Sequence, residues 1–297
     1  MDLRSPEKEH KGLFVLMALY YPVSGGFDYI AIEYITRTIS EPVLIFLRML
    51  LAALIFLIIA FVREGGIRVE RRDFKWMFLA GAVGVGLYYL VEAMAIHNTS
   101  ASLSSLLLAT VPLFGMVSDR IFFKNHLGKV KITGVLISIV GVAFCVCFSG
   151  EDMSGNLLGV LLTLIAAALW AAYISFLKPL EGYSAITQNA VMLLIAAVVL
   201  LPLFLVNDPS QVLMITGFQW VLIVVTTVST VVIGLLTYVV ATAHLTVTTM
   251  SLVANVLPIV SIIGSFFLLH TMLTPLQLVG GALIIGSVIA VAVFGEK

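Results

Sequence analysis

Three ionisable side chains interrupt long apolar segments in the first half of the chain: Asp28, Arg48 and Glu92. A charge inside a membrane helix is costly, and such a residue usually faces a cavity or a charged partner. Because each lies near the same end of its segment, we expect all three roughly 6–9 Å below the outer membrane boundary. This layer predicts either a salt bridge that only pins helices together or a polar chamber that opens to the outside.

The apolar segment that carries Asp28 also contains residues that a simple membrane helix avoids, namely Pro22, Gly25 and Gly26. Proline removes a backbone hydrogen bond and kinks a helix, while glycines permit close approach or local unwinding. Tyr21, Gly25 and Asp28 share one helical face. We therefore predict that Pro22, Gly25 and Gly26 form a gating segment beside the site. The alternative is a kink used only for packing against the glycines at 81, 84 and 86.

Proton exchange is expected of one carboxylate in this layer. Two acids would share a single arginine, so one should keep its charge while the other is the easier to protonate. We predict that Glu92 is the proton-exchanging acid, because unwound backbone near Asp28 would supply N–H groups that keep Asp28 ionised. Asp28 is then expected to serve coupling through the geometry of the site.

Aromatic and amide side chains on other apolar segments could complete a binding site. Tyr88 lies one turn from Glu92, and Trp170 and Tyr173 lie three residues apart. Asn255 is an amide in a hydrocarbon environment and requires a partner there. We therefore predict a substrate site formed by Tyr21, Asp28, Arg48, Tyr88, Glu92, Trp170, Tyr173, Tyr238 and Asn255.

The composition requires that these residues be positioned by membrane helices. Hydrophobic residues make up 61% of the chain and charged residues 11%, and the mean hydropathy is +1.15. Soluble domains carry about 45–50% apolar and about 25% charged residues. Spans of about 20 apolar residues cross the bilayer. The ranges that meet this length are 12–33, 42–62, 74–96, 101–122, 130–148, 157–178, 186–206, 217–240, 246–269 and 275–294. The first range is expected to be a spanning helix, not a cleaved signal peptide.

The basic residues predict the orientation of these ten helices. With both termini in the cytoplasm, 14 of the 16 lysines and arginines lie on the cytoplasmic side. Arg37 alone would be outside, and Arg48 lies within the membrane. The sequence thus predicts a bacterial inner (plasma) membrane protein that crosses several times with N-in and C-in topology.

An internal repeat divides the chain near its middle. A shift of 146 positions aligns "AIHNTSASLSSLLLATVPLFG" with "ATAHLTVTTMSLVANVLPIVS", so that Pro112 meets Pro258 and Gly134 meets Gly280. Five helices is an odd number, so the second copy must be inverted relative to the first. The predicted fold is an all-α membrane protein with ten transmembrane helices in two inverted five-helix repeats, residues 1–148 and 149–297.

Several segments resemble EamA-type proteins of the drug/metabolite transporter superfamily. "LRMLLAALIFL" resembles their second helix, and "AMAIHNTSASLSSLLLATVPLFGMVSDRIFF" with "GVLISIVGVAF" is similar to the long motif of the same domain. "AHLTVTTMSLVANVLPIVSIIGSFFLLHTMLTPLQLVGGALIIGSVI" resembles a second copy. The resemblance covers nearly the whole chain and implies secondary transport of a small molecule, without identifying that molecule.

Other classes of protein lack their motifs in this sequence. We find no phosphate-binding G-x-x-x-x-G-K, no H-E-x-x-H and no G-x-S-x-G. Cys145 and Cys147 are expected to be packing residues, with no metal or other cofactor. We therefore predict a secondary transporter rather than an enzyme, moving a small amino acid-like zwitterion by alternating access, coupled to protons or to another gradient. An exporter of organic cations or drug-like amines is the alternative, and a membrane receptor or scaffold is another.

The partners expected from the sequence are a small-molecule substrate and the lipid bilayer. No basic patch interleaved with aromatic residues indicates nucleic-acid binding. A monomer and a homodimer stay equally open, as do import and export.

Overall fold

The computed structural model describes residues 11–116, 129–147, 153–242, 244–245, 250 and 253–294 of the 297-residue chain. These residues form helices and connecting turns, with no strand among them. Six helices are long and apolar enough to cross a membrane: Gly12–Ile35, Glu41–Glu64, Phe74–Asn98, Leu157–Leu180, Ala185–Val206 and Gly217–Ala241. Shorter apolar helices are Ala101–Met116, Ile132–Cys145, Val256–Leu268 and Pro275–Val291. The described helices overlap the predicted ranges, but the count of ten spanning helices stays a prediction because these four are short.

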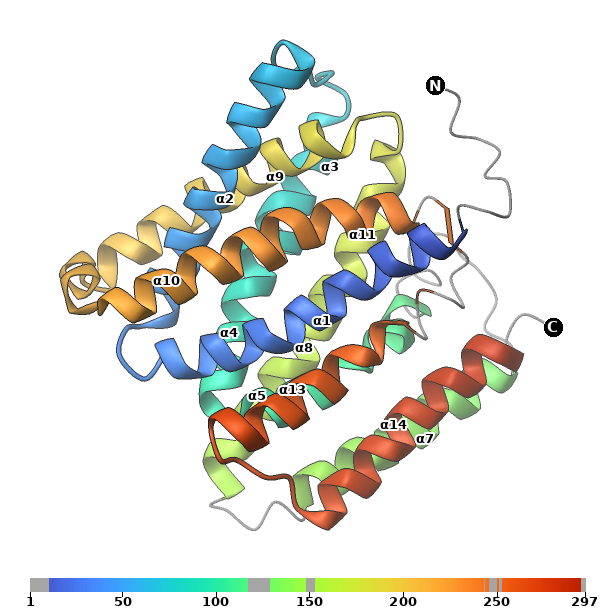
Figure 1. Ribbon diagram of the computed structural model, residues 1–297. Helices are drawn as coiled ribbons and strands as arrows, with labels where there is room; N and C mark the ends of the chain where they lie inside the picture. The colour runs from blue at the N-terminus through green and yellow to red at the C-terminus, as the bar shows by residue number, and fades with distance from the viewer. Residues whose placement is uncertain are drawn as a thin grey trace.

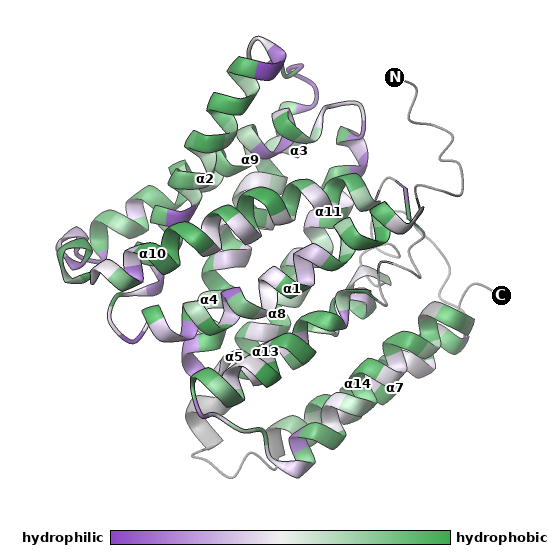
Figure 2. Ribbon diagram, viewed as in Figure 1, coloured by the Kyte–Doolittle hydropathy of each residue, from purple (hydrophilic) through white to green (hydrophobic). Residues whose placement is uncertain are grey.

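The first two helices are α1 (Lys11–Ile35) and α2 (Glu41–Glu64). Ser40 precedes α2, whose first turn contains an acid and a proline, as helix N-termini favour. Gly65 ends α2 with φ 69°, a left-handed conformation that glycine adopts without steric cost. Figure 2 shows hydrophobic residues along most helices and hydrophilic residues gathered near turns, such as the end of α2.

Two long helices each contain a stretch of π-helix. The first consists of α3 (Phe74–Leu79), the π-helix η2 (Ala80–Leu87) and α4 (Tyr88–Asn98). The second consists of α10 (Gly217–Thr226), the π-helix η5 (Thr227–Gly234) and α11 (Leu235–Thr242). The two π-helices begin 147 positions apart, within one residue of the repeat shift. Since π-helices are rare and concentrate at functional sites, this matching position supports a shared role in both repeats.

Two further helices are interrupted at repeat-equivalent positions. The helix α5 (Ala101–Leu108) ends in a turn at Ala109 and Thr110, and helical residues resume at 111–116. A turn at Asn255 likewise precedes α13 (Val256–Leu268). Pro112 lies two residues after the end of the first turn, and Pro258 lies three residues after the second. A proline has no N–H to donate to the carbonyl four residues before it, and its ring clashes with that carbonyl, which favours a break there.

The remaining helices are α7 (Lys129–Cys147), α8 (Met153–Leu177), the short 3₁₀ helix η3 (Lys178–Leu180), α9 (Ala185–Val206), the 3₁₀ helix η4 (Pro209–Met214) and α14 (Pro275–Phe294). Helices α7 and α14 lie side by side at the edge of the bundle (Figure 1). They cross closely, because a Cβ added at Gly141 would come within 2.6 Å of the carbonyl oxygen of Gly280. Cys145 is buried in this contact, as expected of a packing residue, and the side chain of Cys147 lies outside the described residues.

Contacts between the first and second parts of the chain come in matched pairs. Helix α1 packs on α11 as α4 packs on α8, and α1 packs on α13 as α5 packs on α8. The pairs α2 with α9 and α7 with α14 each map onto themselves when the two repeats are exchanged. Such an arrangement is what a two-fold relation between the repeats requires, and it supports the inverted repeat inferred from the sequence.

The expected unwinding of the first helix does not occur. Helix α1 runs without interruption through Pro22 and the glycine pair. The glycines serve close approach to α13, since a Cβ added at Gly26 would lie 2.6 Å from Val260 Cβ. The alternative, packing of this segment against the glycines of the third helix, is also wrong: Gly81 contacts Met192 of α9, and the glycine at 84 contacts Tyr173 of α8. One proline costs only one hydrogen bond, which the packing of α1 on both sides can offset.

Candidate functional site

A cavity of about 400 Å³ lies between the two parts of the chain. Its lining comes from α1, α4, α5 and residues 111–116 on one side, and from α8, α11, η5 and α13 with the residues before it on the other. The cavity extends from the layer of Asp28 and Glu92 to the far ends of α8 and the interrupted fourth helix, where Lys178 and Met116 lie. It therefore has an acidic, aromatic end and a largely apolar remainder.

The acidic end contains an ion pair that is sealed from solvent. Nη2 of Arg48 lies 2.7 Å from both carboxylate oxygens of Asp28, and Nε of Arg48 lies 3.4 Å from the Oγ1 of Thr227. The side chains of Arg48 and Asp28 are 1% and 3% exposed. Two opposite charges this close compensate each other, and the pair joins α1, α2 and η5.

Glu92 has a different environment from Asp28. Its Oε1 accepts a hydrogen bond of 2.7 Å from the hydroxyl of Tyr29 and a second from the hydroxyl of Tyr88. Its hydrogen-bond partners among the described residues are thus neutral hydroxyls, and no described cation is paired with it. Glu92 lines the cavity and is a carboxylate that a cation or a proton could still neutralise.

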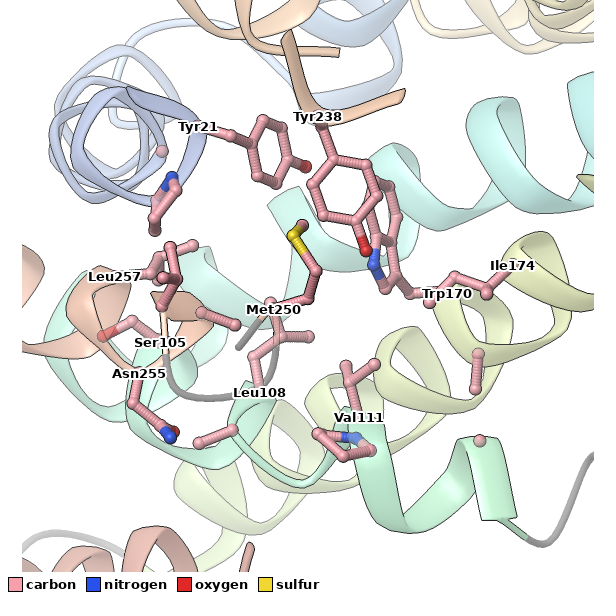
Figure 3. Close-up of a pocket in the computed structure, with 18 of the residues that line it drawn as sticks. Tyr21, Ser105, Leu108, Val111, Trp170, Ile174, Tyr238, Met250, Asn255 and Leu257 are labelled. Carbon is pink, nitrogen blue, oxygen red and sulfur yellow. The ribbon is translucent and has the colours of Figure 1, made fainter. Parts of the chain in front are cut away.

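Aromatic rings form the wall next to Glu92. The ring centroid of Trp170 lies 4.7 Å from that of Tyr88, 5.9 Å from that of Tyr21 and 6.0 Å from that of Tyr238. The rings of Tyr21 and Tyr238 are 5.1 Å apart. Figure 3 shows Tyr21, Trp170 and Tyr238 together at one end of the cavity. Aromatic faces attract cations, so these rings and Glu92 suit a positively charged amino group.

The rest of the cavity has an apolar wall built around the two interrupted helices. Leu108 and Val111 flank the first interruption, and Leu257 follows the second, with Met250 opposite the aromatic rings (Figure 3). Asn255 also lines this part of the cavity. It lies at a turn and not in the middle of a helix as the sequence suggested, since Pro258 interrupts the helix there.

The structure brings most of the predicted site residues to the cavity. Those that line it are Tyr21, Pro22, Gly25, Asp28, Tyr88, Glu92, Trp170, Tyr238 and Asn255. Three others lie outside the lining. Arg48 is held behind Asp28, Tyr173 is fully buried against the glycine at 84, and Gly26 faces α13. We predicted one cluster of Asp28, Arg48 and Glu92. The structure has two, because Arg48 pairs with Asp28 alone and Glu92 bonds to tyrosines.

The predicted site omitted several lining residues, among them Tyr29, Tyr89 and Thr230. Tyr29 follows Asp28 directly and lies four residues after Gly25, which was a usable signal for its position on the same face. Thr230 belongs to η5, where the π-helix rotates side chains relative to an α-helical wheel. The described residues contain no group of three His, Cys, Asp or Glu side chains suited to a metal ion.

Comparison with known proteins identifies relatives of this chain. The sequence profile of the EamA-like transporter family matches residues 12–147 and again residues 157–293. An "Uncharacterized transporter YdfC" of Bacillus subtilis is 32% identical over 107 residues, which cover 36% of this chain and 35% of that protein. An "Uncharacterized transporter" of Archaeoglobus fulgidus is 25% identical over 60% of this chain and 62% of its own. The chain therefore aligns with about a third of the length of the first relative and with less than two thirds of the length of the second.

Longer alignments extend the similarity. A "Probable terminal-alkyne amino-acid exporter" of Streptantibioticus cattleyicolor is 29% identical over 235 residues, 76% of each chain. A solved crystal structure of a protein superposes with a TM-score of 0.67 at 16% identity and covers 98% of both chains. At that identity the superposition shows a shared fold.

Proposed function

Because the chain belongs to the EamA-like transporter family, we propose that it is a secondary active transporter of a small metabolite that carries a cationic amino group. The relatives described above are named as transporters or as an exporter, which points to transport and not to an enzyme. The observation that carries the substrate class is the environment of Glu92. It is a carboxylate in a cavity between the two repeats, hydrogen-bonded to tyrosines and flanked by aromatic rings.

The amino group of the substrate would bind between Glu92 and the aromatic wall. A buried, ionised carboxylate is costly unless a partner compensates it. Arg48 makes its contacts to carboxylate oxygens with Asp28 and makes no hydrogen bond to Glu92 in this structure. A substrate ammonium group would supply the missing charge, and the face of Trp170 would add a cation–π contact.

The apolar remainder of the cavity favours a substrate with a hydrophobic side chain. Leu108, Val111, Met250 and Leu257 would contact that side chain, while its amino group points toward Glu92. A cavity of about 400 Å³ has the size of small-ligand sites. We favour an amino acid-like zwitterion, and the name of the relative from Streptantibioticus cattleyicolor supports this choice.

An exporter of organic cations is the second candidate function. Its support is that Arg48 lies behind Asp28 and that no arginine among the described residues lines the cavity. An amine without a carboxylate would satisfy Glu92 equally well. The two candidates differ in whether the substrate needs its carboxylate.

Transport would proceed by alternating access between two inverted five-helix repeats, with ten helices and both termini in the cytoplasm. The matched contacts between repeats and the 14 basic residues on one side support this arrangement. Proton coupling would follow from competition at Glu92, because a proton and a substrate ammonium group can each neutralise the carboxylate, but not both together.

A counterflow assay in proteoliposomes tests the substrate class. Phenylalanine, phenethylamine and hydrocinnamic acid share one side chain. Phenylalanine carries both charged groups, phenethylamine carries the amine only, and hydrocinnamic acid carries the carboxylate only. A wider panel of amino acids and amines, grouped by the same rule, covers other side chains. An amino acid transporter accepts the zwitterions alone, and a cation exporter also accepts the amines. Uptake of the carboxylic acids but of no amine would contradict binding at Glu92, and protein-free liposomes are the control.

A further inference from the structure

The backbone of Ala101 is held from two sides at the end of the bundle opposite Lys178. Its N–H donates to Oε2 of Glu33 in α1 at 2.7 Å, and its carbonyl accepts from the hydroxyl of Ser261 in α13 at 2.9 Å. Ala101 is the first residue of α5, so the backbone of a single residue joins three helices that come from both repeats.

These bonds are buried and are supported by their surroundings. Ala101 and Ser261 are fully buried, and the side chain of Glu33 is 11% exposed. Arg37 lies 3.0 Å from the second carboxylate oxygen of Glu33 and fixes its position. A hydrogen bond in this environment is stronger than one in water, and loss of one partner leaves a buried polar group without compensation.

The same bonds lie beyond the closed, acidic end of the cavity, where Asp28 and Glu92 are. Asp28 and Glu92 line the cavity, whereas Glu33, Ala101 and Ser261 do not. A passage to this side requires α1 and α13 to move away from the start of α5. Such a movement breaks both bonds to Ala101.

The repeat-equivalent positions at the other end cannot form this structure. A shift of 146 residues places Pro179 at the position of Glu33 and Gly115 at the position of Ser261. Neither residue has a side-chain donor or acceptor. Gly115 lines the cavity, and so does Lys178, the residue before Pro179. The lock is therefore present at one end and missing at the end to which the cavity extends.

We propose that Glu33 and Ser261 are positioning residues of the transport cycle, which hold the outer passage closed by binding the backbone N–H and carbonyl of Ala101 and so favour the inward-facing state. This inference rests on the alternating-access cycle proposed above. "Outer" denotes the end of the bundle that contains Glu33.

Cysteine accessibility tests this lock without any knowledge of the substrate. Cys145 and Cys147 are first replaced by alanine, and Ala109, a lining residue at the first interruption, is replaced by cysteine. A membrane-impermeant thiol reagent is then added to intact cells and, separately, to inverted vesicles. The labelling rate from each side reports how often the cavity opens there.

We expect Ser261→Ala and Glu33→Leu each to raise labelling from the Glu33 side by about three- to tenfold, the usual weight of one buried hydrogen bond. Glu33→Gln should have a smaller effect, because its amide oxygen can still accept from Ala101. The matched control is Ser265→Ala, one turn further along α13, where the hydroxyl is buried and has no hydrogen-bond partner among the described residues. It should leave labelling unchanged.

The lock would be overturned if Ser261→Ala and Glu33→Leu are labelled from the Glu33 side at the same rate as the Ser265→Ala control, whether that common rate is raised or unchanged. A reversed orientation in the membrane would exchange the two sides but keep the difference between variants. Because labelling requires no transport, a failure of the substrate proposal leaves this test intact.

Discussion

The hydroxyl of Tyr29 donates a hydrogen bond of 2.7 Å to the carboxylate of Glu92, across 63 positions of sequence. This contact gives Glu92 a different kind of partner from the neighbouring Asp28, which is paired with Arg48. One acid of the buried layer is thus compensated within the protein, and the other is available to the cavity. On the function proposed above, Asp28 would hold helices together through Arg48, and Glu92 would bind the substrate.

Removal of one member of the ion pair should destabilise the protein strongly. Asp28→Asn or Arg48→Leu alone leaves an uncompensated buried charge or its unsatisfied partner, at a cost of about 3 kcal/mol. The double variant Asp28→Asn/Arg48→Leu should recover part of this loss, because no unpaired charge remains. Thermal unfolding of purified protein measures the effect. If the double variant is as unstable as the sum of both single variants, the charges do not stabilise each other.

The aromatic wall should distinguish cations from neutral molecules. Trp170→Leu removes the ring that contacts Tyr21, Tyr88 and Tyr238, and should weaken binding of amine substrates by about tenfold. Binding of a neutral compound of the same shape should change much less. Competition against a bound amine gives both values. Tyr173→Phe is the control, since its hydroxyl is buried away from the cavity and makes no hydrogen bond. An equal loss for charged and neutral compounds would argue against cation–π binding.

Addition of a single methyl group where α7 crosses α14 should lower the stability of the protein. Gly141→Ala places a Cβ 2.6 Å from the backbone oxygen of Gly280, and backbone atoms cannot move aside easily. We expect a clear fall in the melting temperature. Gly286→Ala in α14 is the matched control, because no atom lies within 4 Å of its Cβ position and alanine favours helix. Equal melting temperatures for the two variants would contradict the close crossing.

The orientation predicts which loops are accessible from outside the cell. Asp208 follows α9, Glu70 follows α2, and both are exposed. In a background without native cysteines, Asp208→Cys should react with an impermeant thiol reagent on intact cells, and Glu70→Cys should react only after permeabilisation. Labelling of Glu70→Cys on intact cells would reverse the orientation.

The sequence predicted the helical segments well, because a run of about 20 apolar residues has few alternatives in a bilayer. The same runs placed Asp28, Arg48 and Glu92 in one layer, and in the structure Asp28 and Arg48 lie close enough to Glu92 for their charges to interact. Their depth in the membrane stays a prediction. The choice of partner did not follow, since the rotation of α2 that turns Arg48 toward Asp28 depends on packing against α9 and η5. The effect of Pro22 was overestimated, because contacts on both sides keep α1 helical.

The interruption at Asn255 shows a second limit. The sequence revealed the paired prolines at 112 and 258, but a proline in an apolar run predicts either a kink or a break. Which of the two occurs depends on neighbouring helices. Here both segments break at equivalent positions and line the cavity. The alignment of the two prolines in the repeat therefore indicated the site better than either proline did alone.

The most direct test of the account is transport by Glu92→Gln in proteoliposomes, measured in two ways with one substrate identified by the counterflow panel. The amide keeps the shape of the side chain and can still accept from Tyr29, but it cannot exchange a proton. We predict that uptake driven by a pH gradient is lost, while exchange between two equal substrate pools continues. Asp28→Asn should impair both measurements, because it disrupts the pair with Arg48. Normal acceleration of Glu92→Gln by a pH gradient would contradict proton coupling through Glu92.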